Sequence, residues 1–574
     1  MARETNGRNH GSSQGKIANH DRLVAMGEAM NQRSATGHRA RPRGRGRRWI
    51  RRSIIAVGLV AVLIIAGVTA DYFYLGSLVN KVNLNGLQSS AGAAENILLV
   101  GSTSRCALKV QNKAYGLCSQ GVNGVNSDIT MILHLVPSTR TVSLLSIPRD
   151  LFVPNARAIG SNKIDAALYE GPSQLIAAIE EDFAIPINHY VVLNFDTFAN
   201  VVNALGGVKM YFPVPIFDAY SGLNIERKGC YTLDGYHALQ VVRARHLEIQ
   251  PNPSNHDPRS WPFESLSDLA RIRRTHEFLR VLAAKVAARG LGNPITDQNL
   301  ATSVLPDLTV DSGFSEGHMV SLARTFAHTS ISNVPQFTFP VTNVETGSLL
   351  FYGYYYGDVV FPVQPNGLNA VNQILNVAAG HNTFTGAALP SPSSLRVSVE
   401  NGTGVASQLT SVVNPLRAKG FHIVSFANTA SPGPVSESVV WYGGPPPPAH
   451  GNWTSPALAA AQTVLAQLQG PAIIGYNPKD VTAGATVTVQ IGTGLSVRPT
   501  STTTTKTTTK TTTKTTTKTT TKKTSTTPPV TTTTAFVPPG LKGNKDFTPP
   551  SSVSQALMPW DPRGCNPAGT GPAS

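Results

Sequence analysis

The chain has 574 residues, of which 41% are apolar and 14% are charged, enough for two or three domains with buried cores. Its formal charge of +16 would suit a nucleic-acid-binding protein, but residues 1–52 hold 13 basic against 3 acidic side chains, and residues 498–530 hold 7 basic and no acidic ones. The rest of the chain carries about −1, which excludes a basic globular face. We therefore expect no nucleic-acid partner.

The N-terminal charge precedes a stretch that is typical of a membrane span. Eight arginines in GHRARPRGRGRRWIRR end the basic segment at residues 1–52, and residues 53–70, SIIAVGLVAVLIIAGVTA, carry no charge. As a helix this stretch would be about 27 Å long, close to the apolar thickness of a bilayer. The pattern predicts a disordered cytoplasmic arm, a single transmembrane helix in the cell membrane, and extracytoplasmic domains after it. A cleaved secretory signal is the alternative, but its cationic and apolar regions are normally shorter.

Four cysteines fit an oxidising exterior. Cys106 and Cys118 bracket the short loop CALKVQNKAYGLC, which a disulfide could close with a stabilisation of about 3 kcal/mol. Cys230 and Cys565 remain, and the sequence does not choose among the three pairings that four cysteines allow. Because the sequence contains no C-x-x-C motif and no histidine cluster, we expect no zinc site.

Apolar runs typical of strands alternate with helical periods after a linker at residues 71–94. The expected strands are NILLVG, ITMILHLV, TVSLLSI and HYVVLNF, and the expected helices are PSQLIAAIEEDF, FDTFANVVNALGG and LARIRRTHEFLRVLAAKVAARG. This alternation predicts an α/β (α+β) domain at residues 95–380, in which helices flank a central sheet.

A second, smaller α/β domain is expected at residues 395–497. Its predicted elements are the strands LRVSVENG, FHIVSFAN, ESVVWYG and ATVTVQIG and the helices VASQLTSVVNPLRAKG and PALAAAQTVLAQLQG. Residues 498–574 begin with a Thr/Lys repeat and continue with a Pro-rich stretch. Because they offer few apolar side chains, we expect a low-complexity tail that acts as a solvated cationic spacer.

Charged residues stand at the ends of several predicted elements. Arg149 and Asp150 close LLSIPRD, directly after an apolar strand, and Asp128 stands near the start of the strand in NSDITMILHLV. In LQVVRARH, Arg243 and Arg245 would point the same way if the segment is extended. One guanidinium group can donate two hydrogen bonds to the oxygens of a phosphate, and each of these charge-assisted bonds contributes about 1.5 to 3 kcal/mol. With few acids among them, these arginines suit a polyanion such as pyrophosphate.

The helix that contains DLARIRR adds three charged residues at helical spacing. Asp268, Arg271 and Arg274 follow one another at intervals of three. Each charged group also has a structural explanation. Arg149 and Asp150 could form a surface turn, Arg243 and Arg245 could pair with local carboxylates, and Asp268 with Arg271 could be an ordinary helix pair. Their joint occurrence favours an anion site.

Six blocks of the sequence, in order, resemble the LytR-CpsA-Psr family of cell-wall glycopolymer ligases over about residues 95–290. They are NILLVGSTSR, NSDITMILHL, VSLLSIPRDLFV, NKIDAALYEGPSQLIAAIEEDFAIPINHYVVLNFDTFANVVNALGGV, LDGYHALQVVRARH and DLARIRR. Residues 395–497 are similar to the LytR C-terminal domain, and the nearest likeness is to mycobacterial CpsA-type proteins. The resemblance also implies one N-terminal membrane anchor.

This resemblance implies an Mg²⁺-dependent phosphotransferase. Such an enzyme takes a glycopolymer, here of arabinogalactan type, from a polyprenyl-pyrophosphate carrier and joins it to peptidoglycan; pyrophosphatase activity is a further expectation. The implied partners are the polyprenyl-linked glycan, peptidoglycan and the membrane. Asp128 would hold Mg²⁺. The catalytic residues implied are Arg149, Arg243, Arg245 and Asp268, and the substrate-binding residues implied are Asp150, Lys163, Arg271 and Arg274.

The first block departs from the family pattern. Active members commonly read G-S-D-S-R there, whereas this sequence has Thr103 in place of the aspartate. A hydroxyl is a weaker magnesium ligand than a carboxylate, so the resemblance leaves Thr103 as a weak second ligand beside Asp128. The alternative function is a membrane-tethered protein that binds the polyprenyl-linked glycan or wall polymer without transferring it. A transcriptional attenuator is disfavoured, because no DNA-reading motif precedes the predicted membrane helix.

Overall fold

The computed structural model describes most of the chain between residue 74 and the C-terminus. The described residues are 74, 76–90, 94–103, 117–120, 124–264, 267–289, 302, 305–326, 329, 334–342, 350–351, 354–429, 436–449, 451–499 and 556–573. Four predicted features lie outside them: the basic arm, the transmembrane helix at residues 53–70, Cys106 and the Thr/Lys repeat. Within the described part of the chain, no helix has the length and apolarity that a membrane span requires.

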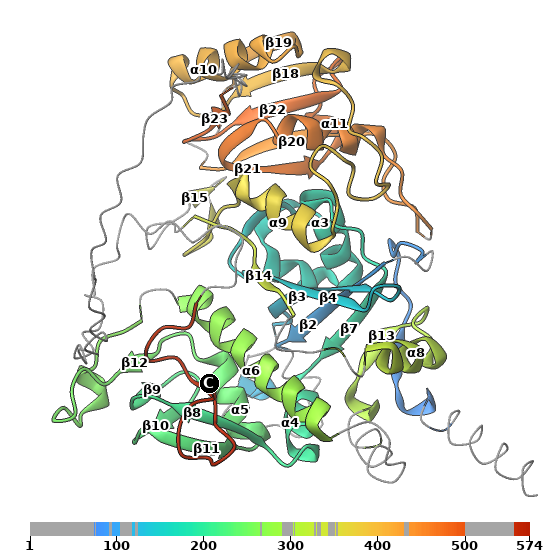
Figure 1. Cartoon of the computed structure of the whole chain (residues 1–574). Helices are drawn as coiled ribbons and strands as arrows, with labels where there is room; N and C mark the ends of the chain where they lie inside the picture. The colour runs from blue at the N-terminus through green and yellow to red at the C-terminus, as the bar shows by residue number, and fades with distance from the viewer. Residues whose placement is uncertain are drawn as a thin grey trace, which may run out of the picture. The chain divides into compact units, whose positions relative to one another are not determined.

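A seven-stranded sheet forms the centre of the first domain, in the order β1-β13-β7-β2-β3-β4-β14 (Figure 1). β2 is antiparallel to β3 and parallel to β7, and β4 is antiparallel to β3. The four strands predicted for this domain are confirmed, and β1 lies in the stretch that was predicted to be only a linker. The strands are β1 (Asn80–Val82), β2 (Glu95–Ser102), β3 (Ser127–Val136), β4 (Thr141–Ile147), β7 (His189–Leu193), β13 (Thr309–Asp311) and β14 (Gln336–Thr338).

Side chains on both faces of this sheet are covered. Along β2, Leu98 and Val100 join the main core, whereas Ile97 and Leu99 belong to a second apolar cluster on the opposite face. This alternation follows from the two-residue period of a strand, and burial on both faces explains why β2 is apolar nearly throughout. The helices of this domain are α3 (Pro172–Phe183), α4 (Phe195–Ala204), α5 (Gly235–Arg243), α6 (Ser267–Arg289), α8 (Glu316–Phe326) and α9 (Asn366–Ile374).

LQVVRARH is not extended, which was the condition for Arg243 and Arg245 to point the same way, because α5 continues through Arg243. The Asp234 side chain accepts the backbone N–H of His237 and so caps the first turn of α5. Apolar residues at helical spacing, such as Ala238, Leu239 and Val242, are buried against the neighbouring core. The chain becomes extended again at Ala244. Arg243 therefore ends a helix, and Arg245 follows it in irregular backbone.

Small sheets complete the described part of this domain; those that contain β8 and β9 contact α5 and α6, whereas β5 lies against α3. β8 lies between β11 and β24, β9 lies between β10 and β12, and β5 pairs with β6 and β15 with β16. These strands are β5 (Phe152–Arg157), β6 (Gly160–Lys163), β8 (Val208–Phe212), β9 (Ile216–Asp218), β10 (Leu223–Ile225), β11 (Gly229–Leu233), β12 (Glu248–Ile249), β15 (Leu350–Phe351), β16 (Tyr354–Tyr355) and β24 (Arg563–Gly564).

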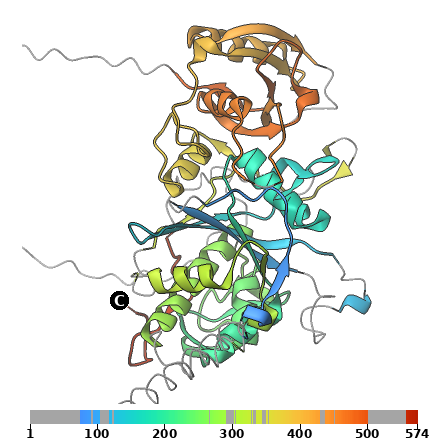
Figure 2. The ribbon, with the colours of Figure 1, turned by 90° about the vertical axis from the view of Figure 1, so that its right-hand side faces the viewer.

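The second domain has an α/β fold, as predicted, but its sheet also includes β17, which lies in the stretch predicted for the first domain (Figure 2). Its sheet has the order β17-β21-β20-β22-β18-β19, with β23 paired to β21. The sequence predicted its two helices and four of its strands but missed β21, because the expected second helix ran into it; α11 ends at Leu465. The elements are β17 (Val363–Gln364), β18 (Arg396–Asn401), α10 (Ala406–Ala418), β19 (His422–Asn428), β20 (Ser438–Tyr442), α11 (Pro456–Leu465), β21 (Leu468–Tyr476), β22 (Val487–Ile491) and β23 (Ser496–Val497).

This second domain packs on α3 of the first. The Tyr442 hydroxyl donates to the backbone carbonyl of Glu181 at 2.9 Å. Thr383, in the connection that precedes β18, donates its hydroxyl to the carbonyl of Ala184 at 2.5 Å. Val439 and Ile473 belong to the main core of the first domain. The two sheets thus share apolar packing.

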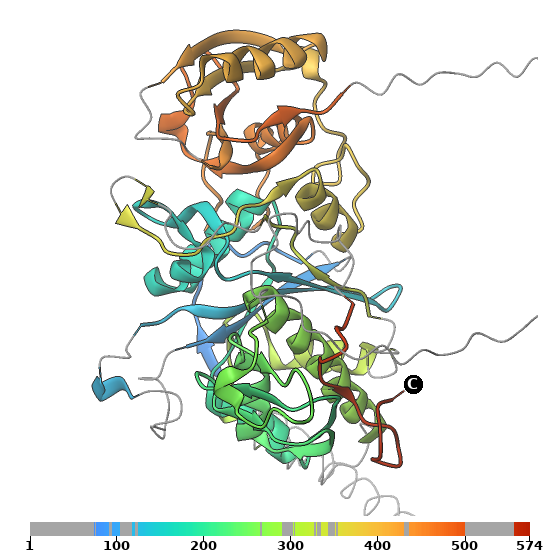
Figure 3. The same cartoon turned by 90° about the vertical axis from the view of Figure 1, so that its left-hand side faces the viewer.

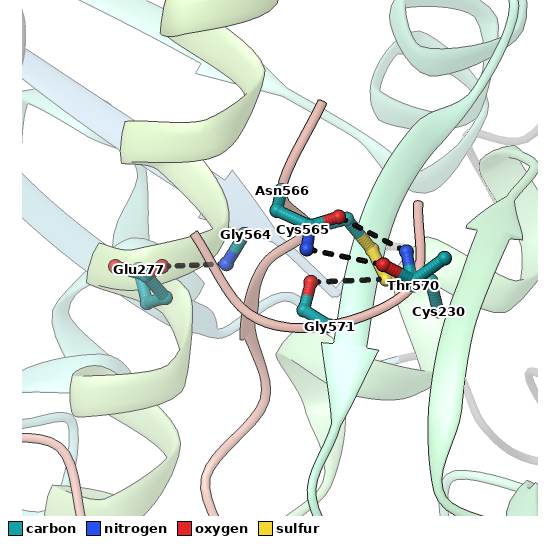
Figure 4. Close-up of a disulfide and its surroundings, with 7 residues drawn as sticks. All are labelled: Cys230, Glu277, Gly564, Cys565, Asn566, Thr570 and Gly571. Atoms are coloured by element: carbon teal, nitrogen blue, oxygen red, sulfur yellow. Dashed lines mark hydrogen bonds between the residues drawn. A yellow bond between two sulfur atoms is a disulfide. The ribbon is translucent and has the colours of Figure 1, made fainter. Parts of the chain in front are cut away.

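The C-terminal residues 556–573 are not part of a low-complexity tail, which corrects the prediction for residues 498–574. β24 pairs with β8, and the C-terminal segment, drawn in red, lies beside the green elements (Figure 3). A disulfide joins Cys565 to Cys230 (Figure 4). Trp560 is 3% exposed and belongs to the core around α5. Trp560 lies 63 residues beyond Val497, the end of β23, and about 30 residues beyond the Thr/Lys repeat, so local composition could not reveal this anchor. Cys118 is also disulfide-bonded.

Candidate active site: a cluster of arginines and aspartates

Arg149 lies at the centre of the charged cluster, directly after β4. Its Nη2 is 2.8 Å from Asp165 Oδ2, its Nη1 donates to Asp128 Oδ1, and its Nε is 3.6 Å from Asp150 Oδ1. The proline before it ends the strand, since a proline supplies no backbone N–H for the sheet. Asp128 comes from β3, the neighbour of β4, so the antiparallel register brings the two side chains together.

Three further cations complete the cluster. Arg245 Nη2 donates to Asp150 Oδ2 at 2.8 Å, and Lys163 Nζ donates to Asp150 Oδ1 at 3.1 Å. On α6, Arg271 Nη2 is 2.8 Å from Asp268 Oδ1 and donates to the backbone carbonyl of Asp128 at 2.5 Å. The ends of β4, β6 and α5 and the first turns of α6 therefore converge on one place.

The cluster contains as many acids as bases. The cations Arg149, Lys163, Arg245 and Arg271 are matched by four carboxylates. The expectation of few acids among the arginines is therefore wrong. It failed because the acids come from separate segments that only folding brings together. The four acidic residues are Asp128, Asp150, Asp165 and Asp268.

Burial and charge set the protonation of the cluster. Burial alone would raise the pKa of Asp150, but Arg245, Arg149 and Lys163 together hold it below its usual value. Burial raises the pKa of Asp165 to about 6, against the lowering effect of Arg149. Burial would lower the pKa of Arg149, but the four surrounding carboxylates outweigh this effect and raise the pKa above its ordinary value. The charge of Asp165 therefore changes near pH 6.

Three guanidinium groups in the cluster keep an unused donor. The Nε–H groups of Arg149, Arg245 and Arg271 are buried, and none of them donates a hydrogen bond to a described residue. Asp150 Oδ1 lies 3.6 Å from Arg149 Nε and Asp268 Oδ1 lies 3.8 Å from Arg245 Nε, both beyond hydrogen-bond distance. A buried donor without an acceptor costs about 1 to 3 kcal/mol, which an incoming oxygen would offset. The cluster can therefore accept an anion with several oxygens, such as a phosphate or pyrophosphate.

Arg274 does not join the cluster with which the sequence grouped it. It is fully buried, pairs with Glu264, and donates to the backbone carbonyl of Ala244 at 2.6 Å. Its neighbour Arg273 binds Glu264 and Asp561, each at 2.5 Å. A step of three residues turns a helix by about 300°, so Arg274 points some 60° away from Arg271 and into the interior. Arg274 is thus an interior structural residue.

The side chain of Arg243 has a different environment from that of Arg245. Its guanidinium lies over the Phe195 ring, 4.7 Å from the ring centroid. The prediction that both arginines share one strand face does not hold, because a helix ends between them.

Thr103 directs its hydroxyl to the protein backbone. Its Oγ1 accepts the N–H of Asn126 at 3.0 Å and lies 3.2 Å from the carbonyl oxygen of the same residue. Asn126 lies two residues before Asp128, so Thr103 supports the segment that leads into the cluster. The four aspartates of the cluster carry carboxylates, which are the type of oxygen ligand that Mg²⁺ prefers.

Sequence reasoning missed Asp165. This residue is 3% exposed, lies in the 3₁₀ helix Ile164–Glu170, and pairs with Arg149. A signal was present in NKIDAA, where Asp165 follows Lys163 by two residues. An acid in an otherwise apolar segment needs a partner when it is buried, and Arg149 was the candidate cation.

Family comparison agrees with the two-domain division. Residues 76–359 match the LytR_cpsA_psr family, and residues 394–494 match a domain described as LytR cell envelope-related transcriptional attenuator. The chain belongs to the LytR-CpsA-Psr family. Its arginine and aspartate cluster lies within the first matched region, and the second matched region corresponds to the domain built around β18–β22.

Curated relatives carry names from cell-wall biosynthesis. The chain is 33% identical over 274 residues to "Probable cell wall biosynthesis protein LcpB" of Corynebacterium glutamicum, covering 47% of this chain and 60% of that protein. It is 26% identical over 427 residues to "Cell wall biosynthesis protein LcpA" of the same organism, covering 66% and 77%. With the Bacillus subtilis "Polyisoprenyl-teichoic acid--peptidoglycan teichoic acid transferase TagT" it shares 29% identity, covering 35% and 64%. The alignments with LcpB and TagT thus span less than two thirds of those proteins.

Solved structures align with about half of this chain. "LytR-Csp2A-Psr enzyme from Actinomyces oris" aligns with 46% of this chain and 88% of its own, with a TM-score of 0.38 and 24% identity. "TagT bound to LI-WTA" aligns with 51% of this chain and 98% of its own, with a TM-score of 0.35 and 22% identity.

Proposed function

We propose that this protein is an extracytoplasmic phosphotransferase that moves a glycopolymer from a polyprenyl-pyrophosphate carrier to a hydroxyl of peptidoglycan. The observation that carries the proposal is that the buried guanidinium Nε–H groups of Arg149, Arg245 and Arg271 donate no hydrogen bond to a described residue. The names of TagT and its relatives agree with this chemistry for those proteins. We further propose a glycan of arabinogalactan type.

In the proposed reaction the acceptor hydroxyl attacks the phosphorus that carries the glycan. A new P–O bond forms to the acceptor, the P–O bond to the bridging oxygen breaks, and polyprenyl phosphate leaves with that oxygen. Arg149, Arg245 and Arg271 stabilise the charge that grows on the leaving phosphate. The acceptor proton leaves to solvent, and Asp268 positions Arg271 at 2.8 Å and accepts the backbone N–H of Arg149 at 3.3 Å.

Charge balance supports a divalent cation as a companion of the substrate. The four cations and four carboxylates of the cluster cancel when all are ionised, so a pyrophosphate diester would bring uncompensated negative charge. Mg²⁺ held by Asp128 would compensate that charge and polarise the phosphate oxygens when bound. Thr103 would contribute at most a weak ligand, because its hydroxyl already bonds to the backbone of Asn126.

An extracytoplasmic location is part of the proposal. The Cys230–Cys565 disulfide and the disulfide-bonded Cys118 support it, because such bonds persist outside reducing compartments. The predicted membrane helix at residues 53–70 would tether the enzyme near its lipid-linked substrate. A reporter fused after Ser574 should give an extracytoplasmic signal, and a cytoplasmic signal would contradict the location.

The test of the activity uses the full chain in detergent with a polyprenyl-pyrophosphate-linked glycan, a peptidoglycan fragment and Mg²⁺. Release of polyprenyl phosphate together with glycan joined to the fragment is expected, and Arg245→Ala should abolish both. Arg417→Ala is the matched control, since Arg417 is an exposed arginine stacked on Phe426 in the second domain. Binding without release would favour the non-catalytic glycan binder. Absence of binding would contradict both functions.

A further inference from the structure

Three metal-ligating side chains gather at the opposite end of β2 from the arginine and aspartate cluster. Glu95 begins β2, His189 begins β7, and His318 lies in the first turn of α8. One ligand atom from each lies within 4.8 Å of the others. β2 and β7 are parallel neighbours, so their first residues lie at the same end of these strands. The length of β2, about 20 Å, separates this group from Asp128.

A buried carboxylate orients His189. Asp311, the last residue of β13, has an Oδ2 atom 3.2 Å from His189 Nδ1 and accepts the backbone N–H of Tyr190 at 3.0 Å. The Phe314 ring stacks on the imidazole at 4.2 Å between centroids. The contact with Asp311 assigns the proton to Nδ1 and leaves the lone pair on Nε2. Carboxylate–histidine pairs of this kind commonly hold a metal-ligating imidazole in place.

The geometry of the other two side chains is compatible with a metal ion. His318 Nε2 is 2.8 Å from Glu95 Oε2. Around a tetrahedral zinc ion with bonds of about 2.0 to 2.1 Å, ligand atoms stand about 3.4 Å apart, so this pair would need to open by roughly half an ångström. The His318 side chain is 34% exposed on a surface helix, which permits that movement and gives an ion a path from solvent.

We propose that Glu95, His189 and His318 form a binding site for a divalent transition metal of the zinc type, with Asp311 as the positioning residue. Two imidazoles and one carboxylate select such a metal over Mg²⁺ and Ca²⁺, which prefer oxygen ligands alone. The Glu95 side chain is 2% exposed, and a metal charge would compensate its burial more fully than one hydrogen bond. The bound ion would tie α8 to the edge of the central sheet.

The expectation of no zinc site rested on the absence of a local motif. The three ligands are separated by 94 and 129 residues in the sequence, so no spacing rule could have linked them. The competing explanation is two independent pairs, His318 with Glu95 and His189 with Asp311. If these are two independent pairs, replacing either histidine should not change metal binding. If they form one site, replacing His189 or His318 should each abolish metal binding.

The experiment is a zinc titration of the chelator-treated full chain, with Co²⁺ as a spectroscopic substitute that reports ligand geometry. The wild-type protein should bind one equivalent that His318→Ala and His189→Ala each lose, and Asp311→Asn should weaken binding about 10- to 100-fold. His237→Ala is the matched control, because His237 is an exposed histidine 57% accessible at its side chain and paired with Asp234. It should retain the equivalent.

A second measurement guards against loss of fold. Zinc should raise the unfolding temperature of the wild-type protein and of His237→Ala, but not that of His318→Ala, whose partly exposed side chain makes misfolding a lesser concern. The proposal is wrong if the histidine variants bind zinc as the wild type does, or if the wild type binds no more zinc than they do. Neither readout involves glycan transfer, so the result is independent of the proposed transferase activity.

Discussion

Arg149 and the buried Asp165 form an ion pair, with Nη2 and Oδ2 2.8 Å apart, at the centre of the charged cluster. Burial raises the pKa of Asp165 to about 6, with only partial compensation by Arg149. The carboxylate therefore gains a proton as the pH falls through about 6. Protonation removes one negative charge from beside Arg149 and makes the cluster more cationic.

The first prediction follows from this titration. Affinity for a pyrophosphate diester, whose charge is constant between about pH 5 and 8, should rise by about tenfold as the pH falls through 6, because a neutral Asp165 no longer competes for Arg149. Asp165→Asn should bind with the higher affinity at every pH and lack this step. Calorimetric titration of both proteins over this range is the measurement. Equal pH profiles for the two proteins would show that Asp165 is not responsible.

The same group has a consequence for stability. Its folded pKa of about 6 lies above the usual value for aspartate, so the folded protein binds the proton more tightly than the unfolded chain does. The contribution of Asp165 should therefore favour folding below about pH 4 and decline as the pH rises to 6. Asp165→Asn should remove this decline from a denaturation series recorded without ligand.

The second prediction separates anion binding from folding. Arg245→Ala should weaken pyrophosphate binding by about 10- to 100-fold, because it removes a charge-assisted donor, while the unfolding free energy changes little at this partly exposed side chain. Arg245→Lys should rescue poorly, since lysine lacks the planar fork. Arg243→Ala should cost less binding than Arg245→Ala, because Arg243 stacks on Phe195. Equal losses of binding and stability for Arg245→Ala would indicate a structural ion pair instead.

Much of the fold could be predicted because local patterns determine it. β2, β3, β4 and β7 follow apolar runs, and α3 begins at Pro172, as the sequence indicates. β21 was missed because its first residues continue the apolar pattern of α11, and such short apolar runs do not distinguish helix from strand.

The site was predictable only in part. Arg149, Asp128 and Arg271 stand at element ends, where neighbouring strands bring side chains together. Asp165 and the separate position of Arg274 depend on contacts between distant segments and on helix rotation, which no local pattern encodes. The C-terminal anchor was hidden for the same reason, since its partners lie about 290 residues earlier, as Arg273 does from Asp561.

The third prediction concerns Thr103. In the proposed enzyme, Thr103→Asp should lower the Mg²⁺ concentration needed for half-maximal pyrophosphate cleavage and raise the rate, because it adds a carboxylate ligand near Asp128. The new side chain can still accept the N–H of Asn126. Thr103→Asn is the control that keeps the shape without the charge. If the aspartate variant is active with unchanged metal dependence, Thr103 lies outside the metal site; if all forms bind substrate without cleaving it, the non-catalytic alternative gains support.

The last prediction concerns the C-terminal anchor, residues 556–573. Asp561 is fully buried, accepts from Arg273 Nε at 2.5 Å and from the backbone N–H of Met558 at 2.7 Å, and lies 3.7 Å from Arg274 Nη1. Glu264 is the other carboxylate on these two arginines, so removing the Asp561 charge leaves a buried positive charge without compensation.

Asp561→Asn should therefore lower the unfolding free energy by about 3 to 5 kcal/mol, as breaking a buried ion pair does. Arg271 and Asp268 lie on the same helix as Arg273, so the loss of stability should be accompanied by weaker pyrophosphate binding. Asp234→Asn is the control, because asparagine still caps α5 and the side chain is exposed. Denaturant titration of the full chain with its disulfides intact measures the difference. A loss no larger than that of the control would show that the anchor contributes little to the domain that carries the site.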